Sequence, residues 1–192
     1  MPLTKEDIIT LPDPKLRQTS RKVGIINDDI VRIADEMISA TLSWDASREH
    51  EVGVALAAVQ IGKLYKIIVI RNNHDDKNDK TFTVFINPEI TKMEGKLISD
   101  FEGCLSVPNI YGKVKRYSKV RVKAINLAGK PFRVTAEGFL ARIFQHEIDH
   151  TNGIVFIDHI RNDSDAFYIL GDNGKLNDLD YEEVKDNSIL WE

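Results

Sequence analysis

The chain has 192 residues, of which 42% are hydrophobic and 29% are charged, and its formal net charge is −4. This length suits one globular domain, or one domain with a tail. The negative net charge excludes a generic nucleic-acid-binding protein, and the single cysteine, Cys104, excludes an internal disulfide bond.

Apolar stretches in the chain are short. The first ten residues contain no apolar run of the length of a signal peptide. The longest nearly uncharged stretch, residues 52–62, is interrupted by Gln60, whereas a membrane-spanning helix needs roughly 20 apolar residues. The expected location is therefore cytoplasmic, with a trimmed organelle precursor as the alternative.

The beginning of the chain predicts one amphipathic helix. Two prolines make residues 11–18 extended and irregular. Apolar residues then recur at helical spacing over residues 27–42, and Asn27 or Asp28 can cap a helix there.

Strands are predicted in the middle of the chain. Residues 66–70 (KIIVI) have the composition of a buried strand, and residues 81–86 (TFTVFI) that of its partner. The polar residues 71–80 between them predict an exposed loop. Residues 120–125 alternate like a half-buried strand, and extended structure continues after a turn at residues 132–134.

A second helix is predicted over residues 137–150, with Thr135 as a candidate cap and Gly153 as a plausible stop. The character of the chain changes beyond about residue 158. Residues 177–192 contain six acidic residues and one basic residue, and this tail is expected to be a short helix or a loosely held segment.

The second helix carries the strongest chemical motif, since residues 146–150 read His-Glu-Ile-Asp-His. Two histidines four residues apart lie on one helix face, so both imidazoles can reach one metal ion. Glu147 lies beside them and can take a proton from water. Taken alone, this short pattern favours a metal site and a solvated helix face about equally.

A two-histidine site needs a third ligand. Asp158 and His159 lie downstream, but in no recognisable third-ligand pattern. Cys104 lies upstream within Glu-Gly-Cys-Leu-Ser at residues 102–106, and a thiolate is a good ligand for divalent iron or zinc. A lone cysteine is usually a small buried hydrophobic residue, but here the glycine and the polar neighbours favour a special loop.

A third segment, residues 53–60, reads Gly-Val-Ala-Leu-Ala-Ala-Val-Gln. Its small side chains would let a substrate backbone approach closely, and Gln60 places an amide at its end. Taken alone, such a segment is more often a tightly packed helix or strand.

In this order, the three segments resemble the signature of the peptide deformylase family, which is G-φ-G-L-A-A-x-Q, E-G-C-L-S and Q-H-E-x-D-H. The second and third boxes match fully, as EGCLS and QHEIDH, and the first reads GVALAAVQ. The resemblance runs from around Pro12 to about Ile160. It implies a hydrolase that removes the formyl group from N-formylmethionyl nascent polypeptides and releases formate.

The resemblance also implies a metal ion bound by Cys104, His146 and His150, with water in the open fourth position. The usual metal of the family is Fe²⁺, with Zn²⁺, Ni²⁺ or Co²⁺ as substitutes, and the ligands are compatible with each. Glu147 is then the general base and later the general acid.

Further site residues follow from the resemblance. The side-chain amide of Gln60 and the backbone N–H of Leu105 stabilise the oxyanion. The backbone of Val54 and Ala55 pairs with the substrate main chain. The pocket for the methionine side chain is lined by four residues, namely Val54, Phe139, Ile143 and His146.

One position departs from the family signature, and one charged residue lies beside the predicted pocket. Ala55 replaces the second glycine of the first box. An alanine there is disfavoured if the position needs a positive φ, and it narrows the cleft if the position is only one of close approach. Arg142, beside the pocket, is expected to be solvated, with a position at the rim of the cleft as the alternative.

Two carboxylates, those of Glu102 and Asp149, are candidates to accept the second N–H of a metal-binding imidazole. For Asp149, a solvent-facing helix position is an equal alternative.

The expected fold class is α+β, a single domain of mostly antiparallel strands around a central helix that carries the H-E-x-x-H motif, with an appended acidic C-terminal tail. The expected division is a peptide deformylase-like catalytic domain over residues 1–160 and a C-terminal extension over residues 161–192, packed on or loosely attached to it.

Partners other than the formylated peptide are few. The acidic tail would be repelled by ribosomal RNA. The basic residues within 113–123 offer another surface for a transient ribosome contact, although the wet face of a strand is the favoured interpretation. No DNA or membrane partner is expected.

Two other functions compete with the deformylase. A metallopeptidase that cuts internal bonds shares the H-E-x-x-H motif but leaves Cys104 and Gln60 unexplained. A non-catalytic formyl-peptide-binding relative is supported only by Ala55 and the altered tail, and the retained Glu147 argues against it.

Overall fold

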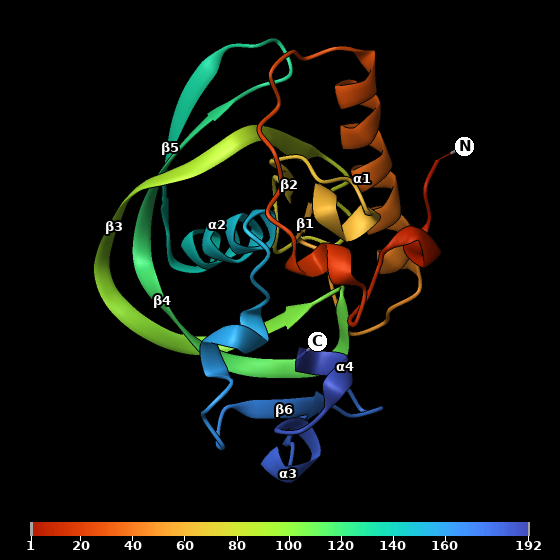
Figure 1. Ribbon diagram of the computed structural model, residues 1–192, viewed down its shortest axis with the longest axis vertical. Coiled ribbons are helices and arrows are strands. Elements are labelled where there is room, and N and C mark those ends of the chain that lie inside the picture. Colours follow the sequence, from red (N-terminus) through yellow and green to blue (C-terminus); the bar gives the residue numbers. More distant parts are fainter. Residues whose placement is uncertain (1, 192) are drawn as a thin grey trace.

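The computed structural model describes residues 2–191; Met1 and Glu192, the two ends of the expected domains, lie outside the described residues. Figure 1 shows long, strongly curved strands that wrap around one central helix, with a second helix packed outside them. Every pair of neighbouring strands in the sheet is antiparallel, in the order β1-β2-β3-β4-β6-β7, and β5 pairs with β4. The predicted α+β class is confirmed.

The sheet contains seven strands. They are β1 (Ala55–Ala57), β2 (Ile67–Arg71), β3 (Phe82–Cys104), β4 (Val107–Ile125), β5 (Pro131–Glu137), β6 (Phe167–Leu170) and β7 (Leu176–Asp178). The predicted pairing of residues 66–70 with 81–86 is confirmed, since Ile67 of β2 lies opposite Ile86 of β3. Strands β3 and β4 are far longer than the sequence predicts.

Helix α1 (Asp28–Ala46) confirms the first predicted helix and extends four residues beyond it. Its cap is Asn27, whose side-chain oxygen accepts a hydrogen bond from the backbone N–H of Ile30 at 3.2 Å. The apolar residues at helical spacing form its buried face, which packs on β1 and β2.

Helix α2 (Gly138–Thr151) is the central helix of Figure 1. The predicted cap at Thr135 is wrong, because that residue belongs to β5 and Glu137 takes the cap position without a side-chain cap bond. Strand β5 leads directly into α2 through Gly138, whose φ of +58° suits glycine. Because the curved sheet surrounds α2, the helix is buried along most of its length.

Short 3₁₀ turns connect these elements. They are η1 (Lys5–Asp7), η2 (Pro14–Arg17), η3 (Ala58–Ile61) and η4 (Phe156–Ile160). The expectation of an extended segment over residues 11–18 is therefore wrong in part, since η2 occupies half of it. Proline at the first position of η2 fits, because that position needs no backbone N–H.

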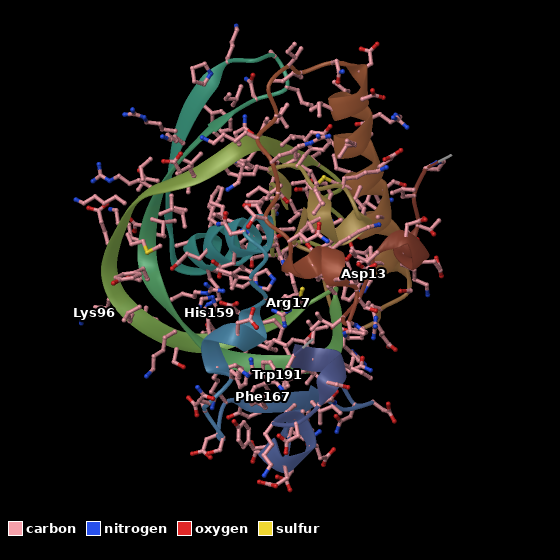
Figure 2. All side chains as sticks on the ribbon, in the orientation of Figure 1. Asp13, Arg17, Lys96, His159, Phe167 and Trp191 are labelled. Atoms are coloured by element: carbon pink, nitrogen blue, oxygen red, sulfur yellow. The ribbon has the colours of Figure 1, made fainter. Side chains whose placement is uncertain are left out.

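The C-terminal segment contains two strands, β6 and β7, and two short helices, α3 (Tyr181–Val184) and α4 (Ser188–Trp191). Strand β6 pairs with β4, so the sheet continues across the expected boundary at residue 160. The rings of Phe167 and Trp191, both labelled in Figure 2, meet with centroids 6.3 Å apart. Arg17 holds the end of the chain by donating to the Leu190 carbonyl at 2.8 Å.

None of the helices within residues 2–191 combines the length and the apolar character that crossing a bilayer requires.

Candidate active site

Three donor atoms converge where the end of β3 meets α2. The Cys104 Sγ lies 3.2 Å from the His150 Nε2, which lies 3.2 Å from the His146 Nε2. The ligand atoms of all three residues lie within 4.8 Å of one another. The structure therefore brings together the three residues that the sequence names as metal ligands.

The chemistry of this donor set fits a divalent transition metal. One thiolate and two imidazoles can occupy three corners of a tetrahedron and leave the fourth open, as catalytic sites do. The other downstream candidates lie elsewhere. Asp158 pairs with Arg17 at 2.6 Å, and His159 pairs with Asp149 at 2.7 Å.

Glu147 lies beside the three donors and is only 5% exposed. Its Oε2 is buried and has no hydrogen-bond partner within residues 2–191. Burial raises the pKa of this carboxyl to about 7, because the charged form is desolvated. A carboxylate with a pKa near neutrality is suited to accept and return a proton.

Glu102 connects the site to its surroundings. Its carboxylate accepts hydrogen bonds from the His146 Nδ1 at 3.0 Å, the Arg116 Nε at 2.9 Å and the Arg142 Nη1 at 2.8 Å. Burial opposes its ionisation, but hydrogen bonds from His146 and Arg116 outweigh burial and hold the pKa of Glu102 well below its ordinary value. Glu102 thus lies where the sequence expects a carboxylate partner of a metal-binding imidazole.

Asp149 takes neither of its two expected positions. Its carboxylate pairs with Arg116 at 2.6 Å and with His159 at 2.7 Å, and its side chain is 19% exposed. Asp149 therefore holds Arg116, which also pairs with Glu102, instead of a metal-binding imidazole.

The expectation that Arg142 is solvated is wrong. Its side chain is 7% exposed and donates to the Glu102 carboxylate, to the Val114 carbonyl at 2.8 Å and to the Ile98 carbonyl at 2.8 Å. On a surface helix the Arg142 side chain would be exposed, but here the curved sheet covers it. Its partners lie on β3 and β4, so its buried position can be seen only once these strands are paired.

Gln60 lies next to Cys104. Its side-chain oxygen accepts a hydrogen bond from the Ala57 N–H at 2.8 Å, which fixes the orientation of the amide. Its nitrogen donates to the Ser106 Oγ at 3.1 Å and lies 3.5 Å from the Cys104 Sγ. The amide nitrogen therefore donates to Ser106 and toward Cys104, one of the three clustered donors.

A cavity of about 300 Å³ opens above these residues. It is lined from α2, from the β1 side and from the β3–β4 turn, and its walls include Val54, Ala55, Gln60, Cys104, Leu105, Phe139, Ile143, His146 and Glu147. All the residues named from the sequence as binding or catalytic thus border the cavity, except His150, which is 1% exposed beneath it.

The backbone of Ala55 is unstrained. Within residues 2–191, the only non-glycine residues with positive φ are Asn87 and Asn109. Ala55 lies in β1, opposite Ile70 of β2. The alternative that this position needs a positive φ is therefore wrong, and the close-approach alternative stays.

Several residues near the cavity have no signal in the sequence. Arg71, expected in an exposed loop, is 1% exposed; it pairs with Asp45 and donates to the Gly53 carbonyl at 3.1 Å. It thereby anchors the start of segment 53–60, which lines the cavity through Val54, Ala55 and Gln60. On the opposite wall, Tyr111 donates to Glu51 at 2.5 Å. These contacts join residues far apart in the chain, so no local pattern reports them.

Comparisons with known proteins agree with this geometry. The chain matches the family model described as Polypeptide deformylase over residues 5–166. The peptide deformylase of Agrobacterium fabrum is 41% identical over 158 residues, which are 82% of this chain and 88% of that protein. The peptide deformylase of Halothermothrix orenii is 46% identical over 148 residues, 77% of this chain and 88% of that protein.

Solved structures give the same result for the fold. The crystal structure of a peptide deformylase from Synechococcus elongatus in complex with actinonin superposes with a TM-score of 0.71 at 36% identity, over 81% of this chain and 79% of that one. The structure of a peptide deformylase from Legionella pneumophila gives 0.67 at 40% identity, over 79% and 83%. The chain therefore belongs to the polypeptide deformylase family.

Proposed function

We propose that this protein removes the formyl group from N-formylmethionyl polypeptides and releases formate. The observation that carries the proposal is the convergence of Cys104, His146 and His150 beside the buried Glu147, at the floor of a cavity. The proposed place of action is the cytoplasm, on nascent chains.

Cys104, His146 and His150 would hold one divalent metal ion, for which Fe²⁺ is our first choice and Zn²⁺, Ni²⁺ or Co²⁺ are substitutes. When bound, such an ion polarises a carbonyl and lowers the pKa of a water molecule. The Glu102 carboxylate holds the His146 Nδ1 and so directs its Nε2 toward the other two donors.

Glu147 moves the proton in this proposal. Its carboxylate accepts a proton from the attacking water, whose oxygen forms a bond to the formyl carbon. The same proton then passes from Glu147 to the amide nitrogen as the bond between that nitrogen and the formyl carbon breaks. Formic acid and a free amino terminus are the products; the acid gives its remaining proton to the amine and leaves as formate, and the Glu147 carboxylate is back in its starting state.

Gln60 and Leu105 supply hydrogen bonds to the oxygen that gains negative charge. The Gln60 amide is already oriented by Ala57, so little reorganisation is needed. Leu105 lies in the two-residue turn that joins β3 to β4, directly after Cys104. Its backbone N–H is the second donor in this proposal.

Selection of the first residue rests on an apolar pocket. Val54, Phe139 and Ile143 border the cavity and would contact the methionine side chain. The short strand β1 follows Val54, and the backbone of Val54 and Ala55 would pair with the substrate as an added strand.

A transient ribosome contact through residues 113–123 has weaker support. Lys119, Arg121 and Lys123 pair with Glu137, Glu94 and Glu89 at 2.7, 2.7 and 3.0 Å, respectively. These pairs favour the wet face of a strand. Unchanged co-sedimentation with ribosomes after charge reversal of these residues would eliminate the contact.

The test is product analysis. Anaerobically prepared, iron-loaded protein is incubated with formyl-Met-Ala-Ser and, separately, with Met-Ala-Ser. We expect formate and intact Met-Ala-Ser from the first peptide and no change in the second. Cleavage of internal bonds would favour the metallopeptidase, and binding of the formylated peptide without turnover would favour the non-catalytic relative.

A further inference from the structure

One face of the sheet continues the cavity wall outward. Cross-strand partners place their side chains on the same face of a sheet. Gly103 of β3 lies opposite Tyr111 of β4, which lies opposite Tyr168 of β6. Phe101, two residues before Gly103, shares this face. We call the surface formed by Phe101, Tyr111 and Tyr168 the aromatic ledge.

The ledge is continuous with the cavity. Phe101 and Tyr111 both line the cavity, and the rings of Phe101 and Tyr168 meet edge to face with centroids 4.9 Å apart. A Cβ on Gly103 would lie only 2.5 Å from the Tyr111 ring, so that ring covers the Gly103 backbone. Tyr168 therefore extends an apolar wall that begins next to Cys104.

The C-terminal strands also touch the other side of the cavity mouth. The turn between β6 and β7 contains Gly174, where a Cβ would lie 2.9 Å from the His50 ring. His50 and Glu51 line the cavity, and Glu51 accepts the hydrogen bond of Tyr111. The segment after residue 166, beyond the match to the family model, thus contributes to the mouth of the site.

Geometry sets which part of a substrate can reach the ledge. Phe101 precedes Cys104 by three residues in β3, which is about 10 Å along a strand. An extended peptide advances about 3.3–3.6 Å per residue, so its third residue lies roughly that far from the formyl carbon.

A cation completes the ledge. The Lys113 ammonium lies 5.1 Å from the centre of the Phe101 ring and 4.9 Å from that of Tyr168. Cation–π attraction of this kind holds both rings in place at the surface. The ledge stays accessible, since Phe101 is 36% exposed and Tyr168 is half-buried.

We propose that the aromatic ledge binds the third and fourth residues of the formylated chain and favours apolar or aromatic side chains there. This inference rests on the proposed deformylation and adds a determinant of substrate preference that comes from the C-terminal segment. Tyr168 is the residue that only this segment supplies.

The test compares a formyl dipeptide, formyl-Met-Ala, with the tetrapeptide formyl-Met-Ala-Phe-Ser. In Tyr168→Ala we expect KM for the tetrapeptide to rise about twofold to tenfold, the range of one aromatic contact, while kcat stays the same. KM for the dipeptide, which ends before the ledge, stays within about twofold. Tyr168→Phe keeps the ring and should keep the KM of the unmodified enzyme.

The matched control is Ile169→Ala, which removes an exposed apolar side chain on the opposite face of β6. An unchanged tetrapeptide KM in Tyr168→Ala would overturn the ledge as a binding site. An equal rise for both peptides, or the same rise in Ile169→Ala, would also overturn it by showing a structural effect. Formate release from the dipeptide by the unmodified enzyme decides the proposed function separately.

Discussion

At the scale of single residues, the site depends on charges that are buried in pairs. The Glu102 carboxylate accepts hydrogen bonds from His146, Arg116 and Arg142. Arg116 also donates to the Asp149 carboxylate, and Arg142 to the Val114 carbonyl. Removing one partner from such a network leaves the other charges buried without compensation.

Arg142→Met therefore tests the network at its position on α2. We expect the free energy of unfolding in urea to fall by about 3–5 kcal/mol, because Glu102 and three backbone carbonyls lose a donor. The matched control is Arg133→Met, at an exposed arginine, which should change stability by less than about 0.5 kcal/mol. Equal effects of the two substitutions would contradict the buried role of Arg142.

Gln60→Glu tests the amide as a donor. The substitution keeps an oxygen to accept from Ala57 but removes the N–H groups near Cys104. We expect kcat for a formyl peptide to fall about 10²- to 10³-fold, the range for loss of one oxyanion donor. Steady-state kinetics with a melting curve for each protein checks this, and an unchanged kcat would remove Gln60 from the reaction.

The residues that the sequence predicts best are those carried by local motifs. Helical spacing predicts that the two histidines share one face of a helix, but their grouping with Cys104 is implied only by the resemblance to the family, and the structure brings these three residues together. Arg142, Asp149 and the buried Arg71 were misplaced for a common reason: their partners lie on distant strands. No spacing within a helix or loop encodes such pairs.

At the scale of elements, periodicity decides what can be predicted. Helix α1 and strand β2 have clear apolar patterns and lie where expected. Strands β3 and β4 extend far beyond their predicted ranges. The sequence pattern misses these parts because shifts in register, as between Glu94 and Leu97, interrupt the alternation of apolar and polar side chains. Residues 91–101 of β3, beyond the part that pairs with β2, are also mostly exposed and have little apolar character.

Gly53→Ala tests how α1 packs on segment 53–60, which lines the cavity. A Cβ at Gly53 would lie 2.8 Å from the Thr41 Cγ2, inside the range of repulsion. We expect a loss of about 1–3 kcal/mol in the free energy of unfolding from this overpacking. Adding Thr41→Ser removes that methyl group and should restore part of the loss; a double variant no more stable than Gly53→Ala would contradict the contact.

At the scale of the whole molecule, Glu102 links stability to pH. Its pKa in the folded protein lies well below the ordinary value of 4.5. Above 4.5 the carboxyl is ionised in both states, and its contribution to stability is complete. As the pH falls below that value, the unfolded chain binds the proton first, and the contribution is lost toward the lower, folded pKa.

Urea unfolding of metal-free protein between pH 7 and pH 3 measures this linkage. We expect the free energy of unfolding to fall below about pH 4.5, as for a carboxyl that is ionised only in the folded state. Glu102→Gln, which cannot titrate at this position, should start less stable and lose less on acidification. Equal acid losses in the two proteins would contradict the role of Glu102.

The structure of the C-terminal segment is the part of the molecule that the sequence predicts least well. Its acidic composition leaves open a short helix or a loosely held segment; the structure has the two short helices α3 and α4, and Val184 and Leu190 are buried in one cluster with Leu16 and Phe156. The few apolar residues among the acids make these contacts. These apolar residues are not spaced at the period of a helix or a strand. The sequence of a packed tail therefore looks like that of an unpacked one.

The central claim, hydrolysis of a formyl group with Glu147 as the base, is tested most directly by formate release in iron-loaded protein and its Glu147→Gln variant, with bound metal measured in both. We predict one metal equivalent in each protein and a kcat about 10²- to 10⁴-fold lower in the variant, the usual contribution of a general base. Equal turnover in the two proteins, or no formate from the unmodified protein with its metal bound, would contradict the account.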